Sequence, residues 1–291
     1  MPPSDEAEAL RGLSRRLLGV AAVLGLLLIA VVANHWLHDG DEVINPFNPI
    51  SAAASQTAAA GGYTADTAVA YTVEDGPPVK ASGTAEYNAE TGRARADISV
   101  PTPAGTVDVE SVGDSSHVYI RSAAFAGQLP DGAEWIGIEP LLGQTSPGLA
   151  GSDGAKQQLQ MLRAVADVEK VGSEAIGGVV TQRYHGTIYI DRVADYFAEK
   201  GAAPLADEYR KLAKLMPDPI PVEVWIGPDG TVREMRIISK LPSEDGRPGV
   251  TMDMRITIDE LGVKPDIDLP DPGSVYDATP LLREQLSQIS A

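Results

Sequence analysis

The stretch "VTMDMRITIDELGV", from Val250 to Val263, alternates apolar and polar residues with a period of two. Its apolar positions are Met252, Met254, Ile256 and Ile258. Alternation of this kind predicts a β-strand with one buried face and one solvated face. Half of the buried face is methionine, a side chain that fills irregular gaps and adaptable surfaces. The face therefore either packs on the interior of the protein or lines a space for a ligand.

Similar alternating segments follow one another after Tyr63, separated by short turns rich in Gly, Asn, Asp and Pro. One is "RARADISV" at 93–100, and another is "PVEVWI" at 221–226, joined by "GPDG" to "TVREMRIIS" at 231–239. Turns of this chemistry between alternating runs indicate β-hairpins. Because sequential hairpins build an antiparallel sheet, the segments predict roughly nine or ten antiparallel strands.

Three segments in the middle of the chain have helical spacing instead, at 153–168, 191–201 and 204–217. The second begins at Asp191, a capping residue, and ends at Gly201, and the third lies between Pro204 and Pro217. Each helix has one apolar stripe, which must cover an apolar surface. We therefore expect an α+β fold in which a single curved antiparallel sheet wraps two or three helices.

The N-terminal region contains an unbroken apolar run, "LLGVAAVLGLLLIAVVA" at 17–33, which extends through Leu37. This is close to the roughly 20 residues that a helix needs to cross a bilayer. Arginines precede the run and no Lys or Arg follows it until Lys80, which places the N-terminus in the cytoplasm. The alternative is a signal peptide cleaved after Ala33, which would release a secreted protein.

The resulting domain plan has five parts. We expect a cytoplasmic tail at 1–16, a transmembrane signal anchor at 17–37 and a flexible tether at 38–62, where "SAAASQTAAAGG" is of low complexity. An extracytoplasmic domain at 63–279 and a short C-terminal helix or tail at 280–291 follow. The localisation expected is a single-pass protein of the cell membrane.

Composition and motifs argue against several function classes. The net charge of -18 would repel a phosphate backbone, so nucleic acid is a poor partner. The chain has no cysteine. The spacing of His35 and His38 could hold a metal, but their place beside Trp36 at the membrane exit indicates an interfacial belt, and His117 and His185 have no partner at ligand spacing. We therefore predict no metal site and no cofactor. No nucleophile elbow, P-loop or dinucleotide fingerprint occurs, and we therefore expect no enzymatic activity.

Three phrases resemble a known family: "KVGSEAIGGVVTQRYHGTIYID" (170–191), "PVEVWIGPDGTVREMRI" (221–237) and "MRITIDELGVKPDIDLPDP" (254–272). They are similar to the actinobacterial LppX/LprAFG lipoproteins, which are related in fold to the lipoprotein carrier LolA. The resemblance implies a strongly curved antiparallel half-barrel with helices on its concave face and a hydrophobic cavity between them. It also implies lipid or glycolipid acyl chains as ligands, and possible contact with a membrane transporter. The lipobox cysteine usual in the family is missing here.

Strand parity, together with the apolar stripe of the 204–217 helix, then assigns the residues that line the expected cavity. We expect a lipid-lining set of Leu212, Leu215, Met216, Val222, Val224, Ile226, Met235, Ile237, Met252, Met254, Ile256 and Ile258. The function expected is a membrane-anchored, extracytoplasmic lipid-binding protein that takes part in lipid transport or presentation in the cell envelope. The alternative is an interaction or sensory module of the same fold with no lipid ligand.

Overall fold

The computed structural model describes most of the chain after Asn48. The ranges are 48–74, 76–102, 105–114, 116–125, 127–138, 165–199, 219–241 and 249–280, with isolated positions between 203 and 213 and at 243. The predicted cytoplasmic tail, signal anchor and C-terminal tail lie outside these ranges, apart from residue 280. Within them, no helix is both long and apolar enough to span a membrane.

The fold is one twelve-stranded sheet with the order β12-β6-β5-β4-β3-β2-β1-β11-β10-β9-β8-β7. All neighbours pair antiparallel except β12 and β6, which pair parallel. The first strand after the N-terminal helix, β1, pairs with the last long strand, β11, and so joins two meanders. The bounds are β1 Gly62–Val73, β2 Val79–Asn88, β3 Arg93–Thr102, β4 Gly105–Gly113, β5 Val118–Ser122, β6 Trp135–Ile138, β7 Val165–Ile176, β8 Val179–Ile188, β9 Ile220–Ile226, β10 Val232–Leu241, β11 Val250–Val263 and β12 Val275–Asp277.

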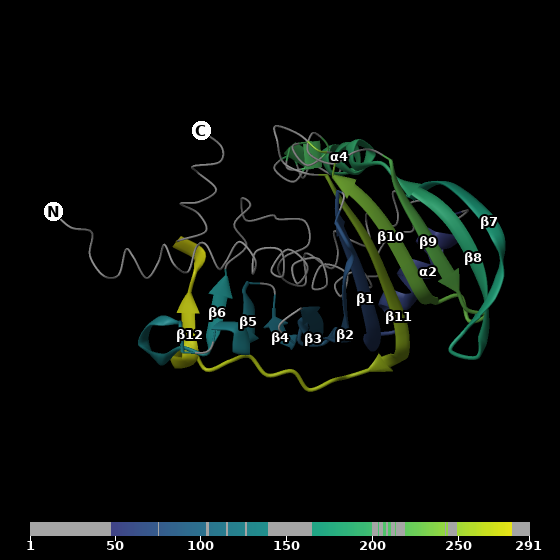
Figure 1. The fold of residues 1–291 in the computed structure, drawn as a ribbon. Coiled ribbons are helices and arrows are strands. Elements are labelled where there is room, and N and C mark those ends of the chain that lie inside the picture. Colours follow the sequence, from purple (N-terminus) through teal and green to yellow (C-terminus); the bar gives the residue numbers. More distant parts are fainter. Residues whose placement is uncertain are drawn as a thin grey trace.

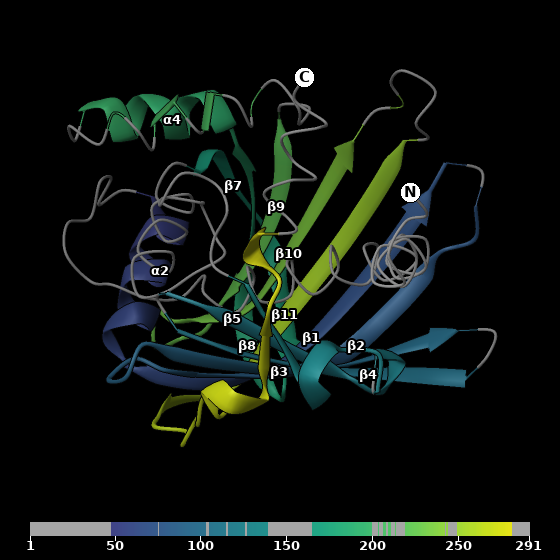
Figure 2. The same cartoon turned by 90° about the vertical axis from the view of Figure 1, so that its left-hand side faces the viewer.

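The sheet bends, and its helices lie on the concave side (Figures 1 and 2). Helix α2 spans Pro49–Ala59 and helix α4 spans Ile190–Glu199. The described positions between 203 and 213 are also helical. Three short 3-10 turns complete the described elements, at Ala123–Phe125, Pro130–Gly132 and Pro272–Ser274. The expected large, mostly antiparallel sheet with helices is therefore confirmed, with twelve strands rather than nine or ten.

Helix α2 corrects the predicted tether. Residues 49–59 are a helix packed on the sheet, because Asn48 caps the first turn and Pro49 occupies its start. The Asn48 side chain accepts hydrogen bonds from the backbone N–H groups of Ile50 (3.0 Å) and Ser51 (3.2 Å), and its Nδ2 donates to the Val165 carbonyl (2.8 Å). A cap that also bonds to a distant strand fixes the helix in place.

The predicted helix at 153–168 is wrong over its last residues. Val165 begins β7, where it pairs with Ile188 of β8, and its side chain is buried in the same cluster as that isoleucine. Burial against a distant strand overrides the helical spacing of a short apolar run. The predicted helix at 191–201 is confirmed over the bounds of α4, and residues 153–164 lie outside the described ranges.

Candidate functional site

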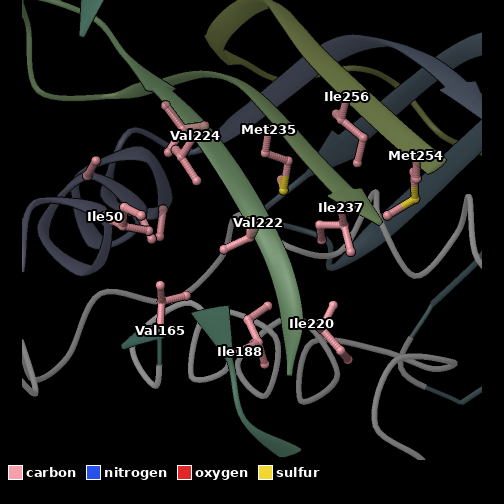
Figure 3. Close-up of a cluster of buried hydrophobic side chains, with 14 of the residues drawn as sticks. Ile50, Val165, Ile188, Ile220, Val222, Val224, Met235, Ile237, Met254 and Ile256 are labelled. Atoms are coloured by element: carbon pink, nitrogen blue, oxygen red, sulfur yellow. The ribbon is translucent and has the colours of Figure 1, made fainter. Parts of the chain in front are cut away.

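The concave face of β9, β10 and β11 is apolar across its width. Directly paired residues share a face of a sheet, and one row runs Val222–Ile237–Met254 while the next runs Val224–Met235–Ile256. Figure 3 shows these side chains in one cluster with Ile50 of α2 and Val165 of β7. The buried face expected for the 250–263 strand is thus confirmed.

Nine of the twelve residues expected to line a lipid site are described, and all nine lie on this face. Eight are buried, and Met252 is partly exposed at the edge of the same cluster. Leu212, Leu215 and Met216 lie outside the described residues. The structure therefore brings the strand residues together on one buried face.

Two helices cover these strands. From α2, Ile50 and three alanines enter the cluster, and from α4 so do Ile190, Val193 and Phe197. Phe197 stacks on Tyr209 with their ring centroids 5.1 Å apart. Burial raises the pKa of Tyr209 well above its ordinary value. The α2 residues escaped sequence reasoning because an alanine-rich helix has small residues on every side.

The other half of the concave face has a different surface. A second buried cluster covers β2 to β6, where Ile98, Val109 and Ile120 pack with Phe125 and Leu129 from the loop after β5. Where the two clusters meet, β1 to β4 carry several alanine, glycine, serine and threonine residues on the concave side, beside larger residues such as Tyr63 and Tyr87. Sequence reasoning took these strands only as part of the meander.

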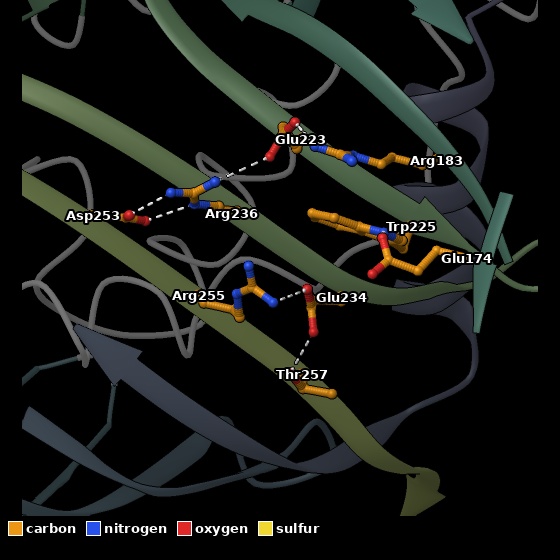
Figure 4. Close-up of polar contacts among 9 residues, drawn as sticks. All are labelled: Glu174, Arg183, Glu223, Trp225, Glu234, Arg236, Asp253, Arg255 and Thr257. Atoms are coloured by element: carbon orange, nitrogen blue, oxygen red, sulfur yellow. Dashed lines mark hydrogen bonds and ion pairs between the residues drawn. The ribbon is translucent and has the colours of Figure 1, made fainter. Parts of the chain in front are cut away.

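The convex face of β8 to β11 is a lattice of ion pairs (Figure 4). Glu223 lies between Arg183 and Arg236, and Arg236 also bonds both oxygens of Asp253, with Nε to Oδ1 at 2.8 Å. The hydrogen bond from Arg236 holds the pKa of Asp253 below its usual range and Asp253 in turn raises that of the guanidinium.

A second part of this lattice lies deeper. Glu234 is only 4 % exposed, and its carboxylate contacts Arg255 at 3.0 Å and accepts from the Thr257 hydroxyl at 2.9 Å. Next to it, the Trp225 indole donates to Glu174 at 2.9 Å. The opposite charges of this part of the lattice therefore compensate one another.

Farther along the convex face, Glu110 of β4 bonds Arg95 and Arg121. Burial acts to raise the pKa of Glu110, but the two guanidinium hydrogen bonds hold it below the usual value. A groove of about 780 Å³ borders these residues, lined also by Asp97, Asp108 and the glycines of the β5–β6 connection. Its lining is mixed, because Ile98, Val109 and Ala133 border it together with the charged side chains.

Metal ligands do not converge in the part of the chain that the structure describes. No group of three or more His, Asp or Glu side chains there could hold an ion. His117 stacks on Tyr119, and His185 lies in β8 opposite Glu223. The apolar concave face is therefore the candidate site on which the described residues converge.

Comparison with known proteins gives structural neighbours only. No protein-family model and no curated protein matches the chain. It is similar in structure to lipoprotein LppX of Mycobacterium tuberculosis, with 15% identity over 75% of this chain and 98% of that chain and a TM-score of 0.40. LprF of Mycobacterium bovis matches with 17% identity, 76% and 95% coverage and a TM-score of 0.40. A LolA superfamily protein of Nitrosomonas europaea matches with 10% identity, 72% and 88% coverage and a TM-score of 0.27.

Proposed function

We propose that the protein is a membrane-anchored, extracytoplasmic lipid-binding protein that holds acyl chains between the concave face of its sheet and the helices. The observation that carries this proposal is the contrast between the two faces. The concave side carries buried apolar clusters over β9 to β11 and over β3 to β5, whereas the convex side carries a compensated ionic lattice. The resemblance of the three sequence phrases to an envelope lipoprotein family points to the same function.

The mechanism is desolvation rather than chemistry. Each methylene group moved from water into the apolar interior contributes about 0.8 kcal/mol. The helices act as the lid: α2 and α4 contact the sheet through a few side chains, whereas neighbouring strands share continuous backbone pairing. In this arrangement the nine described residues, with Leu212, Leu215 and Met216, form the wall against which the chains lie.

The experiment is native mass spectrometry of the full chain, purified in detergent from an actinobacterial host. Co-purified lipid, or uptake of a fluorescent fatty acid by the delipidated protein, is the expected result. An apo mass together with no uptake of the fatty acid would refute the proposal. The tether to the membrane is tested separately, by finding the intact N-terminus in the membrane fraction rather than a form cleaved after Ala33.

One observation favours the alternative, an interaction module with no lipid ligand. Val222, Val224 and Ile50 are 0 % exposed, so this part of the face is packed by the protein's own side chains. Met254→Lys separates the two functions. In a closed core the buried ammonium prevents folding, whereas a wall that opens accepts the lysine, keeps its circular dichroism spectrum and loses fatty-acid uptake. Thr251→Lys, on the convex side of the same strand, is the matched control.

A further inference from the structure

Where the two apolar clusters meet, β1 to β4 carry a floor of small side chains on the concave face, with Ala65 in the first cluster and Ala85 and Ala96 in the second. One row of directly paired residues runs from Ile258 through Ala65, Ala85, Ala96 and Ser111 to Ile120. The next row runs from Ile256 through Thr67 and Gly83 to Ile98. We call Ala65, Thr67, Gly83, Ala85, Ala96 and Ser111 the small-residue floor; it lies on β1 to β4 (Figure 2). Its side chains end at or just beyond Cβ, so the floor is lower than the isoleucines on either side.

Two members of the floor carry hydroxyl groups that are buried without a hydrogen bond. Thr67 is 4 % exposed and Ser111 is 1 % exposed, and none of the described residues bonds Thr67 Oγ1 or Ser111 Oγ. A buried hydroxyl without a partner is unfavourable, and the great majority of buried side-chain polar atoms have one. Both hydroxyls share the concave face with the residues that pair across it, so a ligand lying on the floor would meet them.

We propose that Thr67 and Ser111 are the polar anchors of the bound lipid, each donating a hydrogen bond to an acceptor oxygen such as an ester carbonyl. This inference rests on the proposed lipid-binding function and deepens it. The floor is buried like the face over β9 to β11, and the row of Thr67 continues directly into Ile256 and Met235 of that face. A chain that lies along the row passes from the hydroxyls onto the apolar wall.

The spacing of the two hydroxyls defines the ligand further. β1 and β4 are separated by three strand intervals of about 4.8 Å, and the rows of Thr67 and Ser111 are offset by two residues, which gives a separation on the order of 15 Å. One compact glycerol head cannot reach both. The two hydroxyls therefore serve two separate acceptor groups, as in a lipid esterified at two distant positions.

The experiment compares two synthetic lipids with the full chain in detergent. One is a long-chain diol esterified at both ends with palmitate, chosen so that its carbonyls match the hydroxyl spacing. The other is the matching bis-ether, which has the same chains and no carbonyl. Affinities come from displacement of a fluorescent fatty acid. The wild type should bind the diester more tightly than the bis-ether by roughly one to two orders of magnitude, since each hydrogen bond is worth roughly a factor of 2 to 12.

Thr67→Val and Ser111→Ala should each weaken diester binding by roughly a factor of 2 to 12 and leave bis-ether binding unchanged. The double variant should bind the two lipids equally. Thr84→Val and Ser99→Ala make the same changes on the convex face and should change neither affinity. Because neither hydroxyl bonds a described residue, both floor variants should fold with unchanged or higher stability, which thermal unfolding checks.

If the wild type binds both lipids equally, the proposed role of the two hydroxyls is wrong, while the proposed lipid-binding function stands. A loss of affinity for both lipids in Thr67→Val overturns it as well, since the residue then acts through packing. Failure of both lipids and of the fatty acid to bind refutes the proposed function itself.

Discussion

Gly186 of β8 lies where helix α2 and strand β7 meet. Adding a side chain at this position tests whether the two elements pack as closely as the structure shows. A Cβ at this position would lie 2.4 Å from Cγ1 of Val165 and 3.3 Å from Cδ1 of Ile50. The first separation is far below contact distance, and the χ1 of valine is stiff. Gly186→Ala should therefore force β7 or α2 to shift.

The magnitude follows from two opposing effects. Overpacking one methyl group costs about 1 to 3 kcal/mol, while replacing glycine in a strand recovers about 0.5 to 1 kcal/mol of conformational entropy. The 2.4 Å contact puts the overpacking in the upper part of its range, at about 2 to 3 kcal/mol, so the net loss is about 1 to 2.5 kcal/mol, or a melting temperature lower by roughly 2 to 10 °C for a domain of this size. Val165→Ala alone removes two methyl groups and should cost about 2 kcal/mol.

The double variant decides whether the contact is real. If the alanine Cβ occupies the space that Val165 vacates, the double variant should be destabilised by only about 2 kcal/mol, and the coupling energy is about 1 to 2.5 kcal/mol. Urea unfolding of the full chain in detergent measures all four proteins. Ala59→Ser, on the exposed side of α2, should change stability by less than about 0.5 kcal/mol. Additive losses in the double variant would refute the packing of β7 and α2 over Gly186.

Three more predictions concern the sheet. Asp253 has a lowered pKa because Arg236 bonds its charged form. The stability that this bond contributes is present above the ordinary carboxyl pKa of about 3.9 and is lost as pH falls through the lower folded-state pKa. Urea unfolding should therefore show that the free energy of unfolding falls less between pH 7 and 2 for Asp253→Asn than for the wild type. Trp225→Phe removes the indole hydrogen bond to Glu174 and should cost about 1 kcal/mol by the same assay, with faster amide exchange along β7. Gly83→Ala would place a Cβ only 1.9 Å from a carbonyl oxygen of β3, so it should cost about 3 kcal/mol or more and open the β2–β3 ladder; a loss below about 1 kcal/mol would contradict the close approach.

Strand parity could be predicted because it depends on local sequence alone. In β11 the alternation places Met254 on the buried face and Asp253 on the exposed face, whichever strands pair with β11. The structure confirms both positions. The same parity in β9 and β10 places Val222 and Ile237 beside Met254. The apolar half of the candidate site was therefore accessible from sequence.

The helix α2 could not be predicted in the same way, because its stability comes from residues distant in sequence. Its turns of Ala, Ser and Thr show no apolar period. The helix is held by Asn48 bonding the Val165 carbonyl, by Thr57 accepting from the Val232 N–H (2.8 Å) and by the space over Gly186. Only the pair "NP" at 48–49 carried a local signal, a cap followed by proline at the helix start.

The floor was missed for a related reason. Alanine and glycine at 65, 83, 85 and 96 look like weak strand positions when each strand is taken alone. Their common feature, a row of small side chains across four strands, exists only once the register is fixed. Unpartnered hydroxyls likewise cannot be recognised before burial is known.

The source of the lipid decides which contacts matter for binding. Against water, a chain of about fifteen methylenes gains roughly 12 kcal/mol on burial. When the chain comes from a bilayer, the gain on burial in the protein is close to zero, because the chain is already out of water. Undocking Ile50 and the three buried alanines of α2 costs about 4 to 5 kcal/mol at 0.8 kcal/mol per methyl group and 1.5 to 3 for the isoleucine.

Apolar burial alone therefore cannot draw a lipid from a membrane onto this sheet. The gain must come from contacts that the bilayer interior does not offer, and the two unsatisfied hydroxyls of Thr67 and Ser111 are such contacts. We expect transfer of the diester between vesicles and the protein to be nearly balanced and reversible, with Thr67→Val shifting it toward the vesicles. Vesicle flotation with labelled diester measures how the lipid is distributed between vesicles and protein. If Thr67→Val leaves this distribution unchanged, the hydroxyl does not hold the lipid and the helices alone control its release.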